Sequence, residues 1–167
     1  FNVNVGSSPK AVKRLFVDHL FLNVLPSKPE GINGSARIAD YPELSRTLQT
    51  CARLHEKFLP YLEDGLLVGD CILSEPCDEA RINGYVLPDK VLIVAMNTGA
   101  QARPITFTCE MAPWLDSPSG RYGIIPYDEG GNPLRARVEV STSWRETILA
   151  LQPDELALFE VVPQGKS

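Results

Sequence analysis

From Leu66 onward, apolar and polar residues of this 167-residue chain alternate in short runs that are separated by turn residues. A side-chain period of two is typical of strands with one buried and one solvated face. The connections are too short for crossover helices, so the pairing should be mostly antiparallel. The pattern predicts a β-sandwich of about eight strands over residues 66–167. The expected strands are 66–73, 80–87, 90–97, 103–110, 121–127, 134–141, 145–151 and 156–162.

Residues that favour turns join two pairs of these runs. Gln152-Pro153-Asp154-Glu155 separates the last two runs, where proline fixes φ and aspartate can bond its own backbone. This stretch predicts a closing β-hairpin. Pro88 and Asp89 predict a second hairpin between residues 80–87 and 90–97. A hairpin cannot bury its faces alone, so further strands must cover both.

Before residue 66, the apolar spacing is helical. Ser8 and Pro9 are a helix-start signal, and the spacing that follows predicts a helix through about Leu22. A long loop rich in proline, glycine and serine follows, Pro26–Asp40. The fold class predicted for the whole chain is therefore α+β, with a helical segment at 1–65 and a sandwich at 66–167.

A second helix is predicted after the loop. Asp40 and Glu43 have the spacing of a capping box. The apolar stripe behind them has spacings of three and four: Leu44, Leu48, Cys51, His55, Phe58 and Leu62. Pro60 should kink or end this helix, and Gly65 suits its C-terminal cap.

Charge and hydropathy exclude two partner classes. The net charge is −5 and no basic patch stands out, so nucleic acid is not expected as a partner. The longest apolar stretches are interrupted by polar residues or proline, so no membrane span is expected. The sequence begins at Phe1 in mid-pattern, which suggests that it is part of a longer protein.

The four cysteines are Cys51, Cys71, Cys77 and Cys109, and none forms a CxxC pair. Free cysteine packs as a small hydrophobic residue, so buried free thiols are the main expectation. A bridge between Cys71 and Cys77 across a strand end stays open. This cysteine usage fits a cytoplasmic location, and a secreted one is not excluded.

The sequence nominates neither a catalytic residue nor a metal or cofactor site. Cys51 and His55 have the i, i+4 spacing of a zinc pair, but further ligands would have to come from elsewhere and His19 is the only other histidine. Cys51 is expected to be buried, which argues against a Cys–His nucleophile. The carboxylates lie mainly in turns and at strand ends, and no pair with glycosidase spacing can be assigned.

Aromatic residues are the best candidates for binding. Trp114, Tyr122 and Tyr127, together with Trp144, could form a platform on which sugar rings stack, and Asp116, Arg121 or Asp128 could bind the sugar hydroxyls. The alternative is that these rings fill the core and edges of the sandwich with their polar tips in water. The loop around Trp114 is favoured for binding because loops at a sandwich end often carry function.

The order of the parts resembles a known arrangement. A helix, LSRTLQTCARLHEKFLPYLEDG, is followed by GDCILSEP, then by YVLPDKVLIVAMNTG and finally by TILALQPDELALFEV. This order resembles the C-terminal region of a (β/α)₈-barrel glycoside hydrolase of the α-galactosidase-like or α-amylase-like kind. The resemblance covers most of the chain and is carried by strand and turn patterns.

The resemblance implies a function without catalysis in this segment. Such enzymes carry their catalytic carboxylates on the barrel, so residues 66–167 are expected to buttress a barrel domain of the same polypeptide. Residues 1–65 are then the barrel end or a linker. The alternatives are a carbohydrate-binding sandwich that uses the loop aromatics and an interaction domain unrelated to sugars. Without the barrel, the uncovered apolar stripes could lead two copies of the isolated chain to pair.

Overall fold

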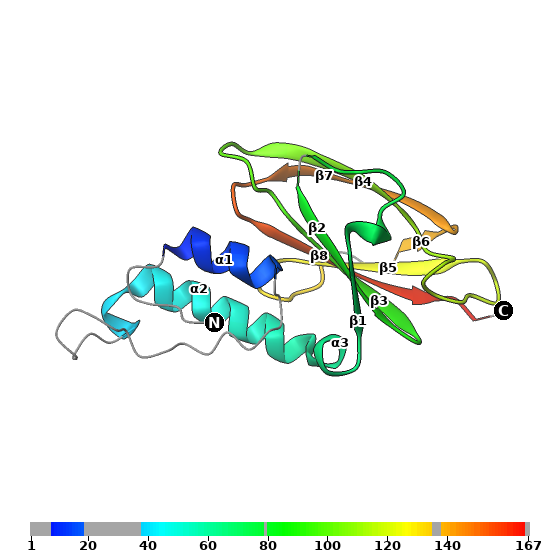
Figure 1. Cartoon of the computed structure of the whole chain (residues 1–167), viewed down its shortest axis with the longest axis horizontal. Helices are drawn as coiled ribbons and strands as arrows, with labels where there is room; N and C mark the ends of the chain where they lie inside the picture. Colours follow the sequence, from blue (N-terminus) through cyan, green and yellow to red (C-terminus); the bar gives the residue numbers. More distant parts are fainter. Residues whose placement is uncertain (1–7, 19–37, 79, 135–137, 166–167) are drawn as a thin grey trace. The chain divides into compact units, whose positions relative to one another are not determined.

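The computed structural model describes residues 8–18, 38–78, 80–134 and 138–165, and the chain divides into two compact units, Phe1–Leu59 and Pro60–Ser167 (Figure 1). The described part of the first unit is mainly helical, and that of the second is mainly antiparallel strands. The predicted α+β class with a β-sandwich of about eight strands is confirmed. The assignment of residues 1–65 to a barrel end or linker stays a prediction.

The first helix, α1 (Pro9–Asp18), begins at the predicted signal. The hydroxyl of Ser8 accepts a hydrogen bond from the Ala11 N–H at 3.1 Å, which satisfies one of the free donors at the helix start. The predicted continuation to Leu22 and most of the long loop lie outside the described residues.

The second helix, α2 (Pro42–Lys57), follows a 3₁₀ turn, η1 (Ile38–Asp40), and contacts α1. The predicted capping box is wrong, because the N-cap residue is Tyr41 and no side chain caps the helix. Pro42 needs no N–H partner at the first helical position, which suits an uncapped start. Its buried positions have a helical period, Leu44, Thr47, Cys51 and Leu54. Of the predicted stripe, Leu44 and Cys51 are buried, whereas Leu48 and His55 are only half-buried.

Pro60 ends the regular helix, as predicted. The chain leaves α2 at Phe58 and forms a separate short helix, α3 (Leu59–Glu63). In a continuous helix the proline ring would clash with the carbonyl four residues earlier. Gly65 follows because any Cβ at this position would collide with the carbonyl oxygen of Tyr61.

The second unit contains two sheets in which every strand pair is antiparallel (Figure 1). One sheet has six strands in the order β1-β2-β3-β8-β5-β6, and the other pairs β4 with β7. A 3₁₀ turn, η2 (Asp70–Ile72), replaces the predicted end of the first strand. The strands are β1 (Leu66–Gly69), β2 (Arg81–Leu87), β3 (Lys90–Met96), β4 (Arg103–Glu110), β5 (Tyr122–Tyr127), β6 (Val138–Val140), β7 (Ser143–Leu151) and β8 (Leu156–Pro163).

The predicted closing hairpin is wrong, whereas the β2–β3 hairpin is confirmed by the pairing of Leu87 with Lys90. β7 pairs with β4, and β8 lies between β3 and β5, so residues 152–155 carry the chain from one sheet to the other (Figure 1). Burial explains the difference. Leu156, Ala157, Leu158 and Phe159 are all buried, which suits a central strand with two covered faces.

The core lies between the two sheets. Phe107 of β4, Trp144 of β7 and Phe159 of β8 form a cluster of edge-to-face rings with centroids 5.3–5.6 Å apart. Such pairs contribute about 0.5–1.5 kcal/mol each beyond the burial of their area. Because the rings come from both sheets, they hold the two layers together. Trp144, one of the aromatics considered for sugar stacking, is therefore a core residue.

Asn97 connects two of the four places where the chain passes from one sheet to the other. Its side chain is fully buried, and its amide nitrogen donates to the carbonyls of Leu151 at 2.9 Å and Gln101 at 2.8 Å. Its side-chain oxygen accepts from the Gly99 N–H at 2.8 Å, and its backbone carbonyl accepts from the Asp154 N–H at 2.8 Å. One residue therefore holds together the β3–β4 and β7–β8 connections.

We predict that Asn97→Ala lowers the free energy of unfolding by about 2–4 kcal/mol, because it leaves buried backbone groups without partners and opens a small cavity. Urea unfolding followed by tryptophan fluorescence measures the change. Gln101→Ala is the matched control, since Gln101 contributes its backbone carbonyl to this corner. Equal stability of the two variants would contradict the role assigned to Asn97.

Candidate functional site

The four residues predicted to contact carbohydrate lie in and around the β4–β5 loop and in β5. Trp114 is half-buried and packs against the core cluster, and Asp116 is exposed. Tyr122 and Tyr127 are 2% and 8% exposed. The loop therefore exposes part of the Trp114 ring and the Asp116 carboxylate, rather than three solvent-facing aromatic rings.

Strand geometry separates the two tyrosines. Tyr122 and Tyr127 are five positions apart in β5, and side chains with an odd spacing in a strand point to opposite faces. Tyr122 belongs to the core cluster, and its hydroxyl donates to the carbonyl of Leu115 at 2.7 Å. Burial, and to a lesser degree Asp116, raise the pKa of Tyr122. The structure does not bring Tyr122 and Tyr127 to one surface.

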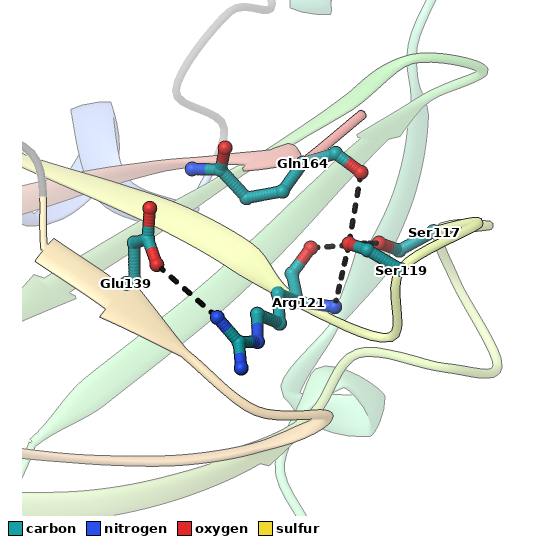
Figure 2. Close-up of polar contacts among 5 residues, drawn as sticks. All are labelled: Ser117, Ser119, Arg121, Glu139 and Gln164. Carbon is teal, nitrogen blue, oxygen red and sulfur yellow. Dashed lines mark hydrogen bonds and ion pairs between the residues drawn. The ribbon is translucent and has the colours of Figure 1, made fainter. Parts of the chain in front are cut away.

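The β4–β5 loop is fixed by polar contacts at its end (Figure 2). Ser117 donates its hydroxyl proton to the Arg121 carbonyl at 2.7 Å, and Ser119 donates to the Gln164 carbonyl at 3.0 Å. The Arg121 N–H donates to the Ser119 hydroxyl at 3.2 Å, and the Arg121 guanidinium lies 3.8 Å from Glu139. These contacts tie the loop to the end of β8, so it is an anchored segment.

A polar cluster missed by the sequence analysis lies on the other face of the six-stranded sheet. Glu160 of β8 accepts hydrogen bonds from the hydroxyls of Tyr61 at 2.8 Å and Tyr127 at 3.2 Å. The ammonium of Lys90 lies 3.8 Å from Glu160 and 5.2 Å from the centre of the Tyr61 ring. The cluster attaches α3 to β3, β5 and β8. The sequence feature that indicates this cluster is Glu160 itself, a single charged residue within the apolar run of β8.

The same face of the sheet is largely apolar, although the buried Asn83 of β2 also lies on it. By strand alternation seven apolar side chains of β2, β3 and β8 point away from the β4–β7 layer and are each 6% exposed or less. A sheet that is apolar on both faces requires a packed layer on each. We call this surface the second face, and its apolar members are Tyr85, Leu87, Leu92, Val94, Met96, Leu156 and Leu158.

A pocket of about 370 Å³ lies on the outer surface of the β4–β7 sheet. Its lining is predominantly polar and consists of Glu75, Pro76, Thr106, Phe107, Thr108 and Arg145. No local sequence motif marks this pocket. The sequence feature that indicates its polar floor is the alternation in β4, where each threonine follows an inward-facing apolar residue.

The four cysteines are free thiols, with Cys51 and Cys109 buried, Cys77 half-buried and Cys71 exposed. The open alternative of a bridge between Cys71 and Cys77 is therefore not realised in this structure. Burial, and then Glu110, raise the pKa of Cys109 to about 12, which keeps that thiol protonated and unreactive near neutral pH. Within the described ranges, no three histidine, cysteine, aspartate or glutamate residues gather as metal ligands.

Sequence comparisons give no relative: no protein-family model matches the chain, and no curated protein does. Across the described ranges, no helix has both the length and the apolar character needed to cross a lipid bilayer.

Solved structures do match the fold. A glycoside hydrolase superposes with a TM-score of 0.66 at 12% identity, over 96% of this chain and 38% of that one. The α-galactosidase I of Mortierella vinacea gives 0.53 at 13% identity, over 99% and 39%. The α-amylase GTA of Geobacillus thermoleovorans, in complex with acarbose, gives 0.50 at 14% identity, over 96% and 35%.

This chain thus spans 35–39% of the length of these three enzymes. At such identities the likeness shows the fold. The resemblance to glycoside hydrolases that the sequence predicted is confirmed at that level.

We predict that the Glu160 cluster makes the fold sensitive to high pH. Burial, and then Glu160, raise the pKa of Tyr127 to about 12, and the same causes raise the pKa of Tyr61 further. An unfolded tyrosine has a pKa of about 10, so above that pH the unfolded chain loses phenol protons that the folded chain keeps. The free energy of unfolding should therefore be fully retained below pH 10 and fall between pH 10 and 12.

Tyr61→Phe tests this prediction. At pH 7 the variant should be less stable by about 1.5–3 kcal/mol, because it loses a hydrogen bond to a charged group. At pH 11 the difference from the wild type should narrow by about 1 kcal/mol, because the variant lacks the phenol that titrates. Urea unfolding at both pH values measures the two differences, and a constant difference would contradict the assignment.

Proposed function

We propose that this chain is the non-catalytic C-terminal region of a glycoside hydrolase, and that its β-unit buttresses a catalytic (β/α)₈ barrel in the same polypeptide. The observation that carries the proposal is the second face. The β4–β7 layer accounts for one face of the six-stranded sheet, and the opposite face is also apolar. A sheet of this kind is suited to lie between its own second layer and a neighbouring layer of helices.

The fold comparisons support this proposal. The three enzymes with matching folds are each more than twice as long as this chain, which leaves room for a separate catalytic domain. They include glycoside hydrolases of more than one kind, an α-galactosidase and an α-amylase. A part shared by enzymes with different activities fits a structural role better than a role in choosing the substrate.

The polar groups of the second face also support a structural role. Glu160 contacts two phenols and a lysine, so its carboxylate is a fixed acceptor that positions α3. Tyr122 and Tyr127 are buried on opposite faces, which favours the buttress over a binding module built on these aromatics. The half-buried Trp114 beside the exposed Asp116 is the feature that supports such a module as the second candidate.

A cytoplasmic location is part of the proposal. Cys71 is an exposed thiol, and Cys77 donates its proton to the Thr106 carbonyl at 3.6 Å. Separate thiols of this kind fit a reducing compartment better than an oxidising one. Detection of a Cys71–Cys77 disulfide in the natively produced protein by mass spectrometry would favour secretion.

We predict that the isolated chain does not hydrolyse aryl glycosides. A glycosidase requires two carboxyl groups about 5–10 Å apart with a free path to substrate, whereas Glu160 is engaged by three side chains. Release of nitrophenol from α- and β-linked glycosides is the measurement. Turnover that disappears in Glu160→Gln would contradict this prediction.

The buttress role is tested in the full-length gene product by deleting residues 60–167. We expect the deletion to lower the melting temperature and soluble yield of the barrel, because it exposes the barrel surface that packs on the β-unit. The KM of folded enzyme for a small aryl glycoside should stay within about twofold, since uniform substrate binding is not affected. Calorimetry and steady-state kinetics measure both.

Two results would contradict the buttress. The first is a barrel that keeps its melting temperature after the deletion and loses affinity only for polymeric substrate, which would indicate a binding module. The second is a full-length gene product that encodes no barrel. Asp116→Ala in the intact protein is the matched control, because it changes the exposed β4–β5 loop and leaves the second face intact.

A further inference from the structure

The pocket on the outer surface of β4–β7 has a rigid floor. Inward side chains of β4, including Phe107, lie in the core, so the outward positions carry Thr106 and Thr108. Across the pair, Thr108 faces Arg145 and Thr106 faces Thr147, whose hydroxyls lie 3.3 Å apart. Polar groups with fixed positions on a sheet are well suited to orient a ligand.

One wall of the pocket is also fixed. The segment after η2 runs beside β4, where Leu73 pairs with Cys109 and the Ser74 N–H donates to the Thr108 carbonyl at 2.9 Å. The thiol of Cys77 donates to the Thr106 carbonyl at 3.6 Å. Glu75 and Pro76 lie between these attachment points, so the backbone holds both beside the threonines.

The pocket brings together polar groups that the described part of the chain leaves without partners. Among the described residues, Arg145, Glu75 and Thr108 form no side-chain hydrogen bond or ion pair. Arg145 offers planar donors, Glu75 offers acceptors and Thr108 offers one of each. Pro76 adds a small apolar surface. A pocket of 370 Å³ is at the lower end of the range for small-molecule sites.

We propose that this pocket binds a neutral saccharide unit through its hydroxyls. Adjacent hydroxyls of a sugar both donate and accept, so they match a site that offers Arg145 on one side and Glu75 on the other. A free anion fits less well, because the Glu75 carboxylate would repel it. Several polyhydroxylated ligands would match these groups. We choose a saccharide because the inference rests on the proposed origin of the chain in a glycoside hydrolase.

The site differs from the aromatic platform considered above in both residues and place. It contains none of Trp114, Asp116, Tyr122 or Tyr127, and it lies on the outer face of the two-stranded sheet. Hydrogen bonds dominate, with no broad ring on which to stack, so weak binding in the millimolar range is expected. Such a site could hold a polymeric substrate near an attached catalytic domain through an increase in effective concentration.

An NMR titration of the ¹⁵N-labelled chain tests the proposal with maltotriose, xylotriose and galactobiose as neutral probes and glucuronic acid as the acidic probe. We expect at least one neutral probe to shift the amide signals of residues 74–77, 106–108 and 145. Arg145→Met and Glu75→Gln should each weaken that binding about tenfold, since each removes hydrogen bonds to a charged group. Thr108→Val should weaken it, and Thr108→Ser should largely retain it.

Arg121→Met is the matched control, because it removes another exposed arginine of the same unit, whose guanidinium faces Glu139. It should bind like the wild type. Three results would overturn the proposal: no shift with any neutral probe at about 50 mM, well above a millimolar Kd; shifts centred on Trp114; or tighter binding of glucuronic acid than of every neutral probe. Binding that Arg145→Met leaves unchanged would also overturn it.

These outcomes are independent of the buttress test. Arg145→Met changes an exposed side chain away from the second face, so it should leave the melting temperature of the full-length protein unchanged. Failure of saccharide binding would remove the pocket's function and leave the buttress intact. Failure of the buttress in the deletion experiment would leave the titration result standing.

Discussion

The buried amide of Asn97 is the constraint on which the two-layer arrangement depends. A chain that moves from one sheet to another must leave a ladder of hydrogen bonds, and the freed backbone groups need new partners. Here the β3–β4 and β7–β8 changes of sheet, two of the four in the chain, occur beside one side chain, which bonds to the carbonyls of Leu151 and Gln101 and to the Gly99 N–H. No apolar residue could supply these contacts, so a polar side chain is buried at this corner.

The arrangement of the sheets explains the different chemistry of the surfaces in this unit. β3 and β8 are central strands with both faces covered, so their sequences are nearly continuous apolar runs. β4 and β7 have one inward face, and they alternate. The second face can therefore serve as a packing surface, while the outer face of β4–β7 displays threonines and Arg145. Under the roles proposed above, structural support and ligand contact would occur on different surfaces.

The sequence predicted which segments would form strands better than which strands would pair. Alternation decides which side of a strand is buried, but it does not name the neighbour. For that reason the sequence correctly predicts strands near 145–151 and 156–162 and a turn between them, but its prediction that they pair as a hairpin is wrong. The uninterrupted burial of Leu156–Phe159 carried the missing information, because a central strand and an alternating strand suit different positions.

The candidate sites were harder to predict, for a related reason. Contacts at the Glu160 cluster join residues up to 99 positions apart, and the pocket joins the segment after η2 to β7, so neither has a local motif. Aromatic residues are the clearest candidates for sugar binding in the sequence, yet Trp144 and Tyr122 are needed to fill the core. In a sandwich of this size, large aromatic side chains are used to fill the core, whereas threonine and arginine on an outward face have no packing role. Where such residues lie beside a carboxylate in a fixed pocket, packing does not account for their positions, and the proposed ligand binding does.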